Sequence, residues 1–140
     1  MERLEPFVGE WSVEATFPGA APGRCVFEWT LGGAFLVARS EAPDPVPESL
    51  QVFGPAAEGD GYVQHYFDSR RIARIYQMSF EDGVWKLWRD TADFSPLPFR
   101  QRFEGRFTDD GNRIEGRWER TQEDGSWMVD FELTYTRVGH

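Results

Sequence analysis

Residues 99–137 read FRQRFEGRFTDDGNRIEGRWERTQEDGSWMVDFELTYTR. In this stretch large apolar side chains recur at every second position, with arginine, glutamate or threonine between them; the apolar set is Phe103, Phe107, Trp127, Val129, Phe131, Leu133 and Tyr135. A period of two is typical of a β-strand with one buried and one solvated face. The pairs Asp110-Gly111 and Asp124-Gly125 favour two-residue turns, which need positive φ angles. The stretch therefore predicts three antiparallel strands joined by tight hairpins.

The same alternation extends towards the N-terminus. It includes Trp11, Val13, Ala15 and Phe17, then Cys25, Phe27, Trp29 and Leu31, and further turn signals at Gly32-Gly33 and Asp82-Gly83. We expect about ten strands, near 10–17, 23–31, 34–41, 48–54, 61–68, 71–80, 84–91, 98–108, 113–121 and 127–138. The segment Arg3–Val8 is expected to form a short helical turn that plugs one end.

Successive hairpins favour an all-β, up-and-down antiparallel barrel, in which closure removes exposed sheet edges. A length of 140 residues predicts a single domain over 1–140. The Pro- and Gly-bearing loops at 41–49, 55–61 and 91–98 are candidates for the barrel mouth.

Charge and composition narrow the partners. The formal net charge of −9 disfavours nucleic acid and anionic membranes. Cys25 is the single cysteine and the first residues are not a signal peptide, so we expect a cytoplasmic protein. The two histidines are distant in sequence, so we expect no metal site and no cofactor. Trp88, with Phe35 and Val37, is a candidate apolar patch for a homodimer contact.

The turns also predict which side chains face the barrel axis, because a two-residue loop fixes the register of its hairpin. Asp124-Gly125 places Trp118 opposite Phe131, and Asp82-Gly83 places Tyr76 opposite Arg89. A turn at Ser69-Arg70 places His65 opposite Arg74. The predicted inner face thus gathers a polar set: His65, Arg74, Tyr76, Arg89 and Gln101.

Arginines on an inner face need an anion, a water-filled lumen or a position near the open end, because an unpaired buried guanidinium is very costly. Our hypothesis is a small, partly apolar ligand whose acidic head is held by Arg74 and Arg89, assisted by Tyr76 and His65. The alternative is that these groups bond to one another, to water, or to a nearby acid such as Asp90.

Gly9-Glu10-Trp11 opens the first strand and Arg137 closes the last. This resembles the lipocalin (calycin) kernel, in which such a tryptophan packs beneath an arginine from the final strand. Tyr66-Phe67-Asp68-Ser69-Arg70, Val84-Trp85-Lys86-Leu87-Trp88-Arg89-Asp90 and Leu133-Thr134-Tyr135-Thr136-Arg137 resemble a bacterial family of lipocalin-like domains of unknown function. The resemblance implies a fold shared with fatty-acid-binding proteins and no particular activity.

Two other functions stay open. Nitrobindin-like barrels, which also begin with Gly-x-Trp, hold haem through a histidine, and here His65 and His140 are available. An isomerase- or cyclase-type enzyme would use His65 as a general base, oriented by Asp68 or Asp90.

Overall fold

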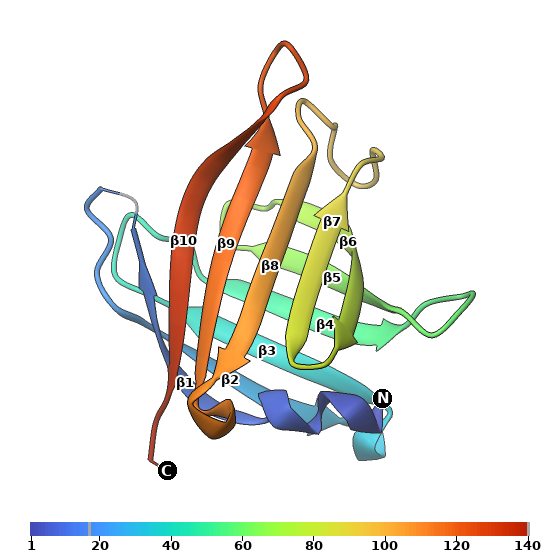
Figure 1. The fold of residues 1–140 in the computed structure, drawn as a ribbon, viewed down its shortest axis with the longest axis vertical. Coiled ribbons are helices and arrows are strands. Elements are labelled where there is room, and N and C mark those ends of the chain that lie inside the picture. The colour runs from blue at the N-terminus through green and yellow to red at the C-terminus, as the bar shows by residue number, and fades with distance from the viewer. Residues whose placement is uncertain (17, 140) are drawn as a thin grey trace.

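A computed structural model describes residues 1–16 and 18–139 and confirms the predicted all-β, up-and-down barrel (Figure 1). Each strand pairs antiparallel with the next, and β1 pairs with β10 to close the sheet. The strands of the described residues are β1 (Gly9–Ala15), β2 (Gly23–Thr30), β3 (Phe35–Glu41), β4 (Ser49–Pro55), β5 (Tyr62–Asp68), β6 (Ala73–Glu81), β7 (Val84–Arg89), β8 (Gln101–Thr108), β9 (Arg113–Thr121) and β10 (Trp127–Arg137). Phe17 and His140, which the sequence analysis singled out, lie outside the described residues.

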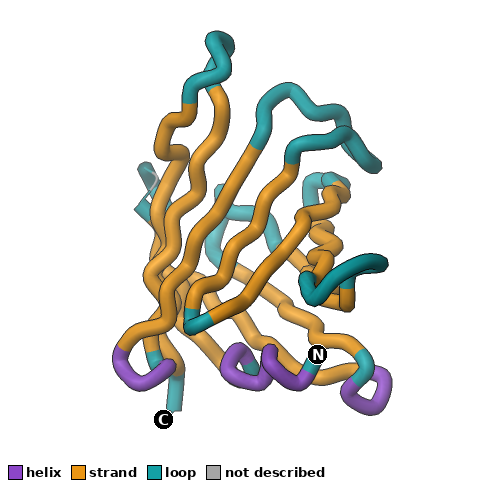
Figure 2. Tube along the Cα trace, turned by 45° about the vertical axis from the view of Figure 1, so that its right-hand side comes forward, coloured by secondary structure: helices purple, strands orange, loops and turns teal. Residues whose placement is uncertain are grey.

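One end of the barrel is plugged by the predicted N-terminal turn, a 3-10 helix η1 (Glu2–Phe7). Leu4 and Phe7 are fully buried, and the Phe7 ring packs edge-on against Phe80, Trp85 and Phe107. The 3-10 turns η2 (Leu31–Gly33) and η3 (Asp109–Gly111) lie at the same end (Figure 2). Leu31, predicted to face inward, is in η2 with 75% of its surface exposed. This end therefore supplies the floor of the barrel.

The expected stack of Trp11 and Arg137 is present at this closed end. The guanidinium lies 4.1 Å from the indole ring centroid, a cation–π distance. Arg137 also donates hydrogen bonds to the carbonyl oxygens of Val8 and Pro6, at 2.6 and 2.7 Å. The Trp11 indole N–H donates to the Phe7 carbonyl at 2.8 Å. These contacts fasten η1 across the barrel end.

The opposite end is the mouth. The connections β1–β2, β3–β4, β5–β6, β7–β8 and β9–β10 lie there, since consecutive antiparallel strands alternate in direction. Two of the predicted mouth loops, 41–49 and 91–98, are among them. The third, 55–61, is not: Arg3 of η1 donates a hydrogen bond to the Asp60 carbonyl, so this loop lies at the closed end.

The register follows the Asp-Gly turns along much of the sheet. Asp82 and Gly83 have φ angles of 51° and 73°, and Phe80 pairs with Trp85 as predicted. Trp118 pairs with both Phe103 and Phe131, also as predicted. These pairings put Trp85, Phe103, Trp118 and Phe131 on the inner face, where they line the barrel cavity.

Two registers differ from prediction, each by one residue. The β5–β6 connection is a turn with an extra residue, because Arg71 adopts a positive φ of 69° and Asp68 N–H bonds to the Ile72 carbonyl. In β10 the register shifts between Val129 and Phe131. Val129 is consequently 46% exposed, and Trp127, expected in the core, lies against the Arg102 guanidinium at 4.0 Å.

The predicted homodimer patch is not a single surface. Trp88 is 38% exposed on β7, as expected, but Phe35 and Val37 are on β3, with three strands between, and Val37 is buried. Self-association stays a prediction. No helix in residues 1–16 and 18–139 is long and apolar enough to cross a bilayer.

Candidate functional site

The barrel encloses a cavity of about 500 Å³ that extends from the mouth to the aromatic floor. This volume falls in the range of small-molecule sites, about 300–1,000 Å³. Ten of the lining side chains are aromatic: Phe27, Phe53, Tyr66, Tyr76, Trp85, Phe99, Phe103, Trp118, Phe131 and Tyr135. The walls are therefore mainly apolar, so a few polar groups decide what can bind.

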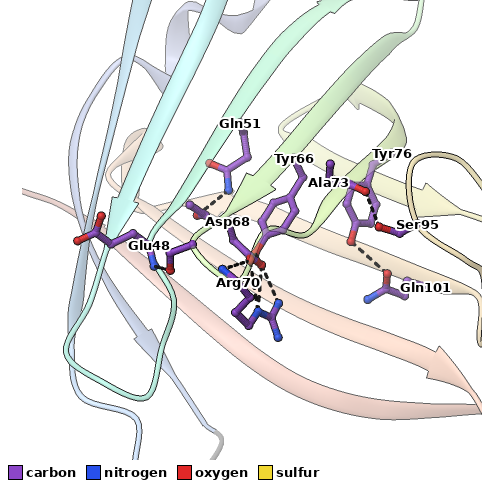
Figure 3. Close-up of polar contacts among 11 residues, drawn as sticks. Glu48, Gln51, Tyr66, Asp68, Arg70, Ala73, Tyr76, Ser95 and Gln101 are labelled. Carbon is purple, nitrogen blue, oxygen red and sulfur yellow. Dashed lines mark hydrogen bonds and ion pairs between the residues drawn. The ribbon is translucent and has the colours of Figure 1, made fainter.

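One group of polar side chains in the lining comes from β4, β5, β6 and β8. The register places Tyr66 between Gln51 and Arg74, and Gln64 beside Tyr76, all on the inner face. The Tyr76 hydroxyl donates to Gln101 Oε1 at 3.0 Å (Figure 3). Burial raises the pKa of Tyr76, although the nearby Arg74 guanidinium opposes this shift through a hydrogen bond. Tyr76 thus stays a neutral phenol between Arg74 and Gln101.

Arg74 differs from the other two cavity-lining arginines, Arg24 and Arg70, which are paired with carboxylates. It is partly buried, lines the cavity, and its Nε atom is buried without a hydrogen-bond partner. Across residues 1–16 and 18–139, no carboxylate forms an ion pair with it. Its neighbour on the same strand face is the neutral phenol of Tyr76, whose pKa burial raises and the guanidinium lowers. The positive charge of Arg74 is therefore not neutralised by the described part of the protein.

A second polar group lies at the rim, where Asp68 joins Tyr66 to Arg70 (Figure 3). The Asp68 side chain is fully buried and accepts hydrogen bonds from the Tyr66 hydroxyl at 2.8 Å and from Arg70 Nη2 at 2.7 Å. Burial opposes ionisation of Asp68, but these hydrogen bonds outweigh it and lower its pKa. Burial, together with the Asp68 carboxylate, raises the pKa of Tyr66. The Tyr66 proton is thus held on the phenol and directed to Asp68.

Arg89 faces inward as predicted but is already engaged. Its side chain is 1% exposed and donates to both carboxylate oxygens of Asp93 at 3.0 Å. It also donates to the carbonyl oxygens of Ser95 and Pro96. The counter-ion is Asp93 rather than Asp90, and Arg89 does not line the cavity. Arg89 therefore anchors the mouth loop.

Asp93 completes this anchor by binding the beginning of β6. It accepts the Ile75 backbone N–H at 2.7 Å, and the Ser95 hydroxyl donates to the Ala73 carbonyl at 2.7 Å. Burial raises the pKa of Asp93, but the hydrogen bonds from Arg89 and from the Ile75 and Ser95 backbone outweigh this and lower it to about 2. The 91–98 loop is thus tied to the strand that carries Arg74 and Tyr76.

The inward position predicted for His65 is wrong. His65 pairs with Val52 and Ile75, and it does not line the cavity. The extra residue in the β5–β6 turn moves the register by one, which reverses the face of every side chain on β5. Gln64 and Tyr66 take the inner positions instead. Of the predicted site residues, Arg74, Tyr76 and Gln101 share the cavity wall, whereas His65 and Arg89 do not.

The remaining candidate groups in the described residues are the thiol of Cys25 and possible metal ligands. Cys25 lines the cavity, but burial raises the pKa of its thiol to about 11, so it stays protonated. Within residues 1–16 and 18–139 there is no group of three His, Cys, Asp or Glu side chains placed to hold a metal ion.

Comparison with protein-family models and with curated proteins gives no match. Among solved structures, the chain is similar to the crystal structure of Rv2717c from M. tuberculosis, with a TM-score of 0.63. The two share 14% sequence identity, and the match covers 99% of this chain and 96% of that one. At this level of identity the likeness supports the barrel fold alone.

Proposed function

We propose that the barrel binds a small, partly apolar molecule through an anionic head, with the head at Arg74 and the apolar body on the aromatic floor. The observation that carries this proposal is a partly buried guanidinium without a carboxylate partner in the described residues, set in the wall of a cavity of about 500 Å³. A charge in such a position is costly unless a counter-charge joins it.

The hydrogen-bonding inventory of the wall supports an anionic head. The hydroxyls of Tyr66 and Tyr76 donate to Asp68 and Gln101, so neither is free to donate to a ligand. Beside the two tyrosines, the wall offers a ligand the Arg74 guanidinium and the side-chain amides of Gln64 and Gln101, while the exposed carboxylates of Glu41 and Asp130 also line the cavity. A guanidinium and amide N–H groups are donors, which suits a carboxylate or another acceptor-rich group.

The alternatives built on His65 have less support. A general base in the cavity would need an inward histidine, and position 65 is on the opposite face. Haem bound through a histidine meets the same difficulty, since none of the described lining residues is a histidine. We also propose that the barrel is lipocalin-like (calycin), which the Trp11–Arg137 stack beneath η1 supports.

The test compares an anionic probe with its neutral parent. Anilinonaphthalene sulfonate and phenylnaphthylamine share the same ring system, and both fluoresce more strongly in apolar sites. In Arg74→Gln, we expect the sulfonate to bind at least about tenfold more weakly, because a charge-assisted hydrogen bond is lost. The neutral parent should change by less than about twofold.

Arg117→Gln is the matched control, because it removes the same charge from an exposed position on β9. It should leave both affinities unchanged. Equal sulfonate affinity in Arg74→Gln and wild type would refute the proposed function, as would the absence of binding to wild type. Urea unfolding of each variant checks that the barrel is intact.

A further inference from the structure

The rings of the cavity form a continuous series from the anion site towards the floor. Tyr66 contacts Tyr76 at 6.2 Å between centroids with an interplanar angle of 88°, and Tyr76 contacts Trp118 at 5.4 Å and 65°. Trp118 then contacts Phe103 at 5.1 Å, and Phe103 contacts Trp85 at 4.8 Å. All five line the cavity. A ligand whose head is at Arg74 therefore meets aromatic faces and edges along its length.

The two rings nearest the cation are held at both ends. Tyr66 is opposite Arg74 in the β5–β6 register, and Tyr76 is the next inward residue on β6. Their backbones are in the sheet, while their hydroxyls are hydrogen-bonded to Asp68 and Gln101. The space beside Arg74 is thus bounded by two perpendicular rings that cannot easily turn aside.

Resting on the proposed function, we infer that the ligand is a planar aromatic carboxylate rather than an acid with a flexible alkyl chain. In an aromatic acid the carboxylate and the ring form one rigid unit. A carboxylate bound to the Arg74 guanidinium therefore places its ring against the Tyr66 and Tyr76 rings. Each well-oriented ring contact improves affinity by about two- to tenfold beyond the apolar area buried.

An alkyl acid lacks both advantages. Its chain gains no oriented ring contact, and it loses the freedom of many rotatable bonds when it is ordered in a rigid cavity. Aliphatic side chains larger than alanine are fewer than aromatic ones in the described lining; they are Val13, Pro45, Val46, Pro47, Leu87 and Leu133. If apolar area alone decided affinity, the alkyl acid would bind more tightly. If oriented ring contacts decide it, the aromatic acid binds more tightly, so the two explanations predict opposite orders of affinity.

Naphthoate and undecanoate provide the test, because both are carboxylates with eleven carbon atoms. Titration calorimetry on the full chain should show naphthoate binding at least about tenfold more tightly. Naphthamide, which keeps the ring and lacks the charge, should bind more weakly than naphthoate.

Trp118→Leu should weaken naphthoate by about three- to tenfold and change undecanoate by less than about twofold. Trp127→Leu is the matched control, since this tryptophan lies on Arg102 outside the cavity lining, and it should alter neither affinity.

Equal affinities, or tighter binding of undecanoate, would overturn the aromatic inference, while Arg74-dependent binding of anilinonaphthalene sulfonate would leave the proposed function in place. Binding of the sulfonate without binding of naphthoate would overturn the inference as well. If none of the three anions binds to wild type, both proposals fall together. The comparison of ligands on the wild-type chain needs no variant, so it holds even if Trp118→Leu fails to fold.

Discussion

The substitution Asp93→Asn tests whether the anchor at the mouth is a stabilising ion pair. It preserves the shape of the side chain and removes the charge that faces the buried Arg89 guanidinium. The Asn oxygen can still accept from the Ile75 or Ser95 backbone N–H, as Asp93 does now. The main loss is therefore the negative charge that neutralises the Arg89 guanidinium.

The expected cost is about 3 kcal/mol in the free energy of unfolding at neutral pH, because leaving one member of a buried pair uncompensated costs about 3–5 kcal/mol and part of the hydrogen bonding survives. Urea slopes of about 1–3 kcal/mol/M turn this into a midpoint about 1–3 M lower. Tryptophan fluorescence reports the transition, since Trp85 and Trp11 are buried.

The stability that Asp93 contributes should fall as the pH is lowered. The folded-state pKa of Asp93 is about 2, below the ordinary value of 3.8. Its ionisation therefore contributes stability that is present above about pH 4 and lost as the pH falls towards 2. A shift of nearly two units corresponds to about 2 kcal/mol. The difference in unfolding free energy between wild type and Asp93→Asn should narrow by about this amount between pH 5 and pH 2.

Asp90→Asn is the control, because Asp90 is exposed and carries the same charge three residues away. It should change stability by less than about 0.5 kcal/mol. If Asp93→Asn costs no more than Asp90→Asn, or if the gap between wild type and Asp93→Asn is constant from pH 5 to pH 2, the argument for the anchor is wrong.

Two further outcomes follow from packing and burial. A Cβ at Gly116 would lie 2.5 Å from the Phe103 ring. Gly116→Ala should therefore lower the free energy of unfolding, measured in urea, by about 1–3 kcal/mol. An unchanged urea midpoint would mean that the ring has room to move. The Cys25 side chain is 2% exposed, and burial raises the pKa of its thiol from 9.0 to about 11. A thiol reagent at pH 8 should therefore label the folded chain at least about a hundredfold more slowly than the urea-unfolded chain. Equal labelling rates would show that the thiol is accessible.

The barrel could be predicted from the sequence because local signals agree with the global fold. Alternating residues define the strands, and Asp82-Gly83 fixes a hairpin through φ angles that glycine adopts easily. Where this pair occurs, Phe80 pairs with Trp85 as predicted. The aromatic interior follows directly from such pairings.

The β5–β6 turn could not be predicted in the same way, because its positive φ falls on Arg71, a residue with no special preference for that conformation. The available signal was Asp68 at the start of the turn, whose carboxylate accepts the Arg70 N–H. Reading Ser69-Arg70 as a two-residue loop moved His65 inside and Gln64 and Tyr66 outside. One extra residue thus changed the proposed chemistry from a titratable imidazole to amides and phenols.

The aspartate that pairs with Arg89 could not be predicted from the sequence, for a different reason. Asp90 and Asp93 both follow β7, and only the path of the loop determines which reaches the guanidinium. The loop returns to β6, where the Ser95 hydroxyl donates to the Ala73 carbonyl, and Asp93 lies against Arg89. No periodicity encodes that path.

The different surroundings of Arg74 and Arg89 show why only one of these two arginines is available to a ligand. Both arginines are on inner faces of neighbouring strands, and both would be costly if left unpaired. Arg89 is compensated by Asp93, which also ties the loop to the Ile75 backbone on β6. The same loop therefore fixes the strand that presents Arg74 while leaving Arg74 without a carboxylate. In the described cavity lining Arg74 is the one guanidinium without a carboxylate partner, which favours a ligand with one negative charge, so a dianion with the same ring should bind no more tightly than the monoanion.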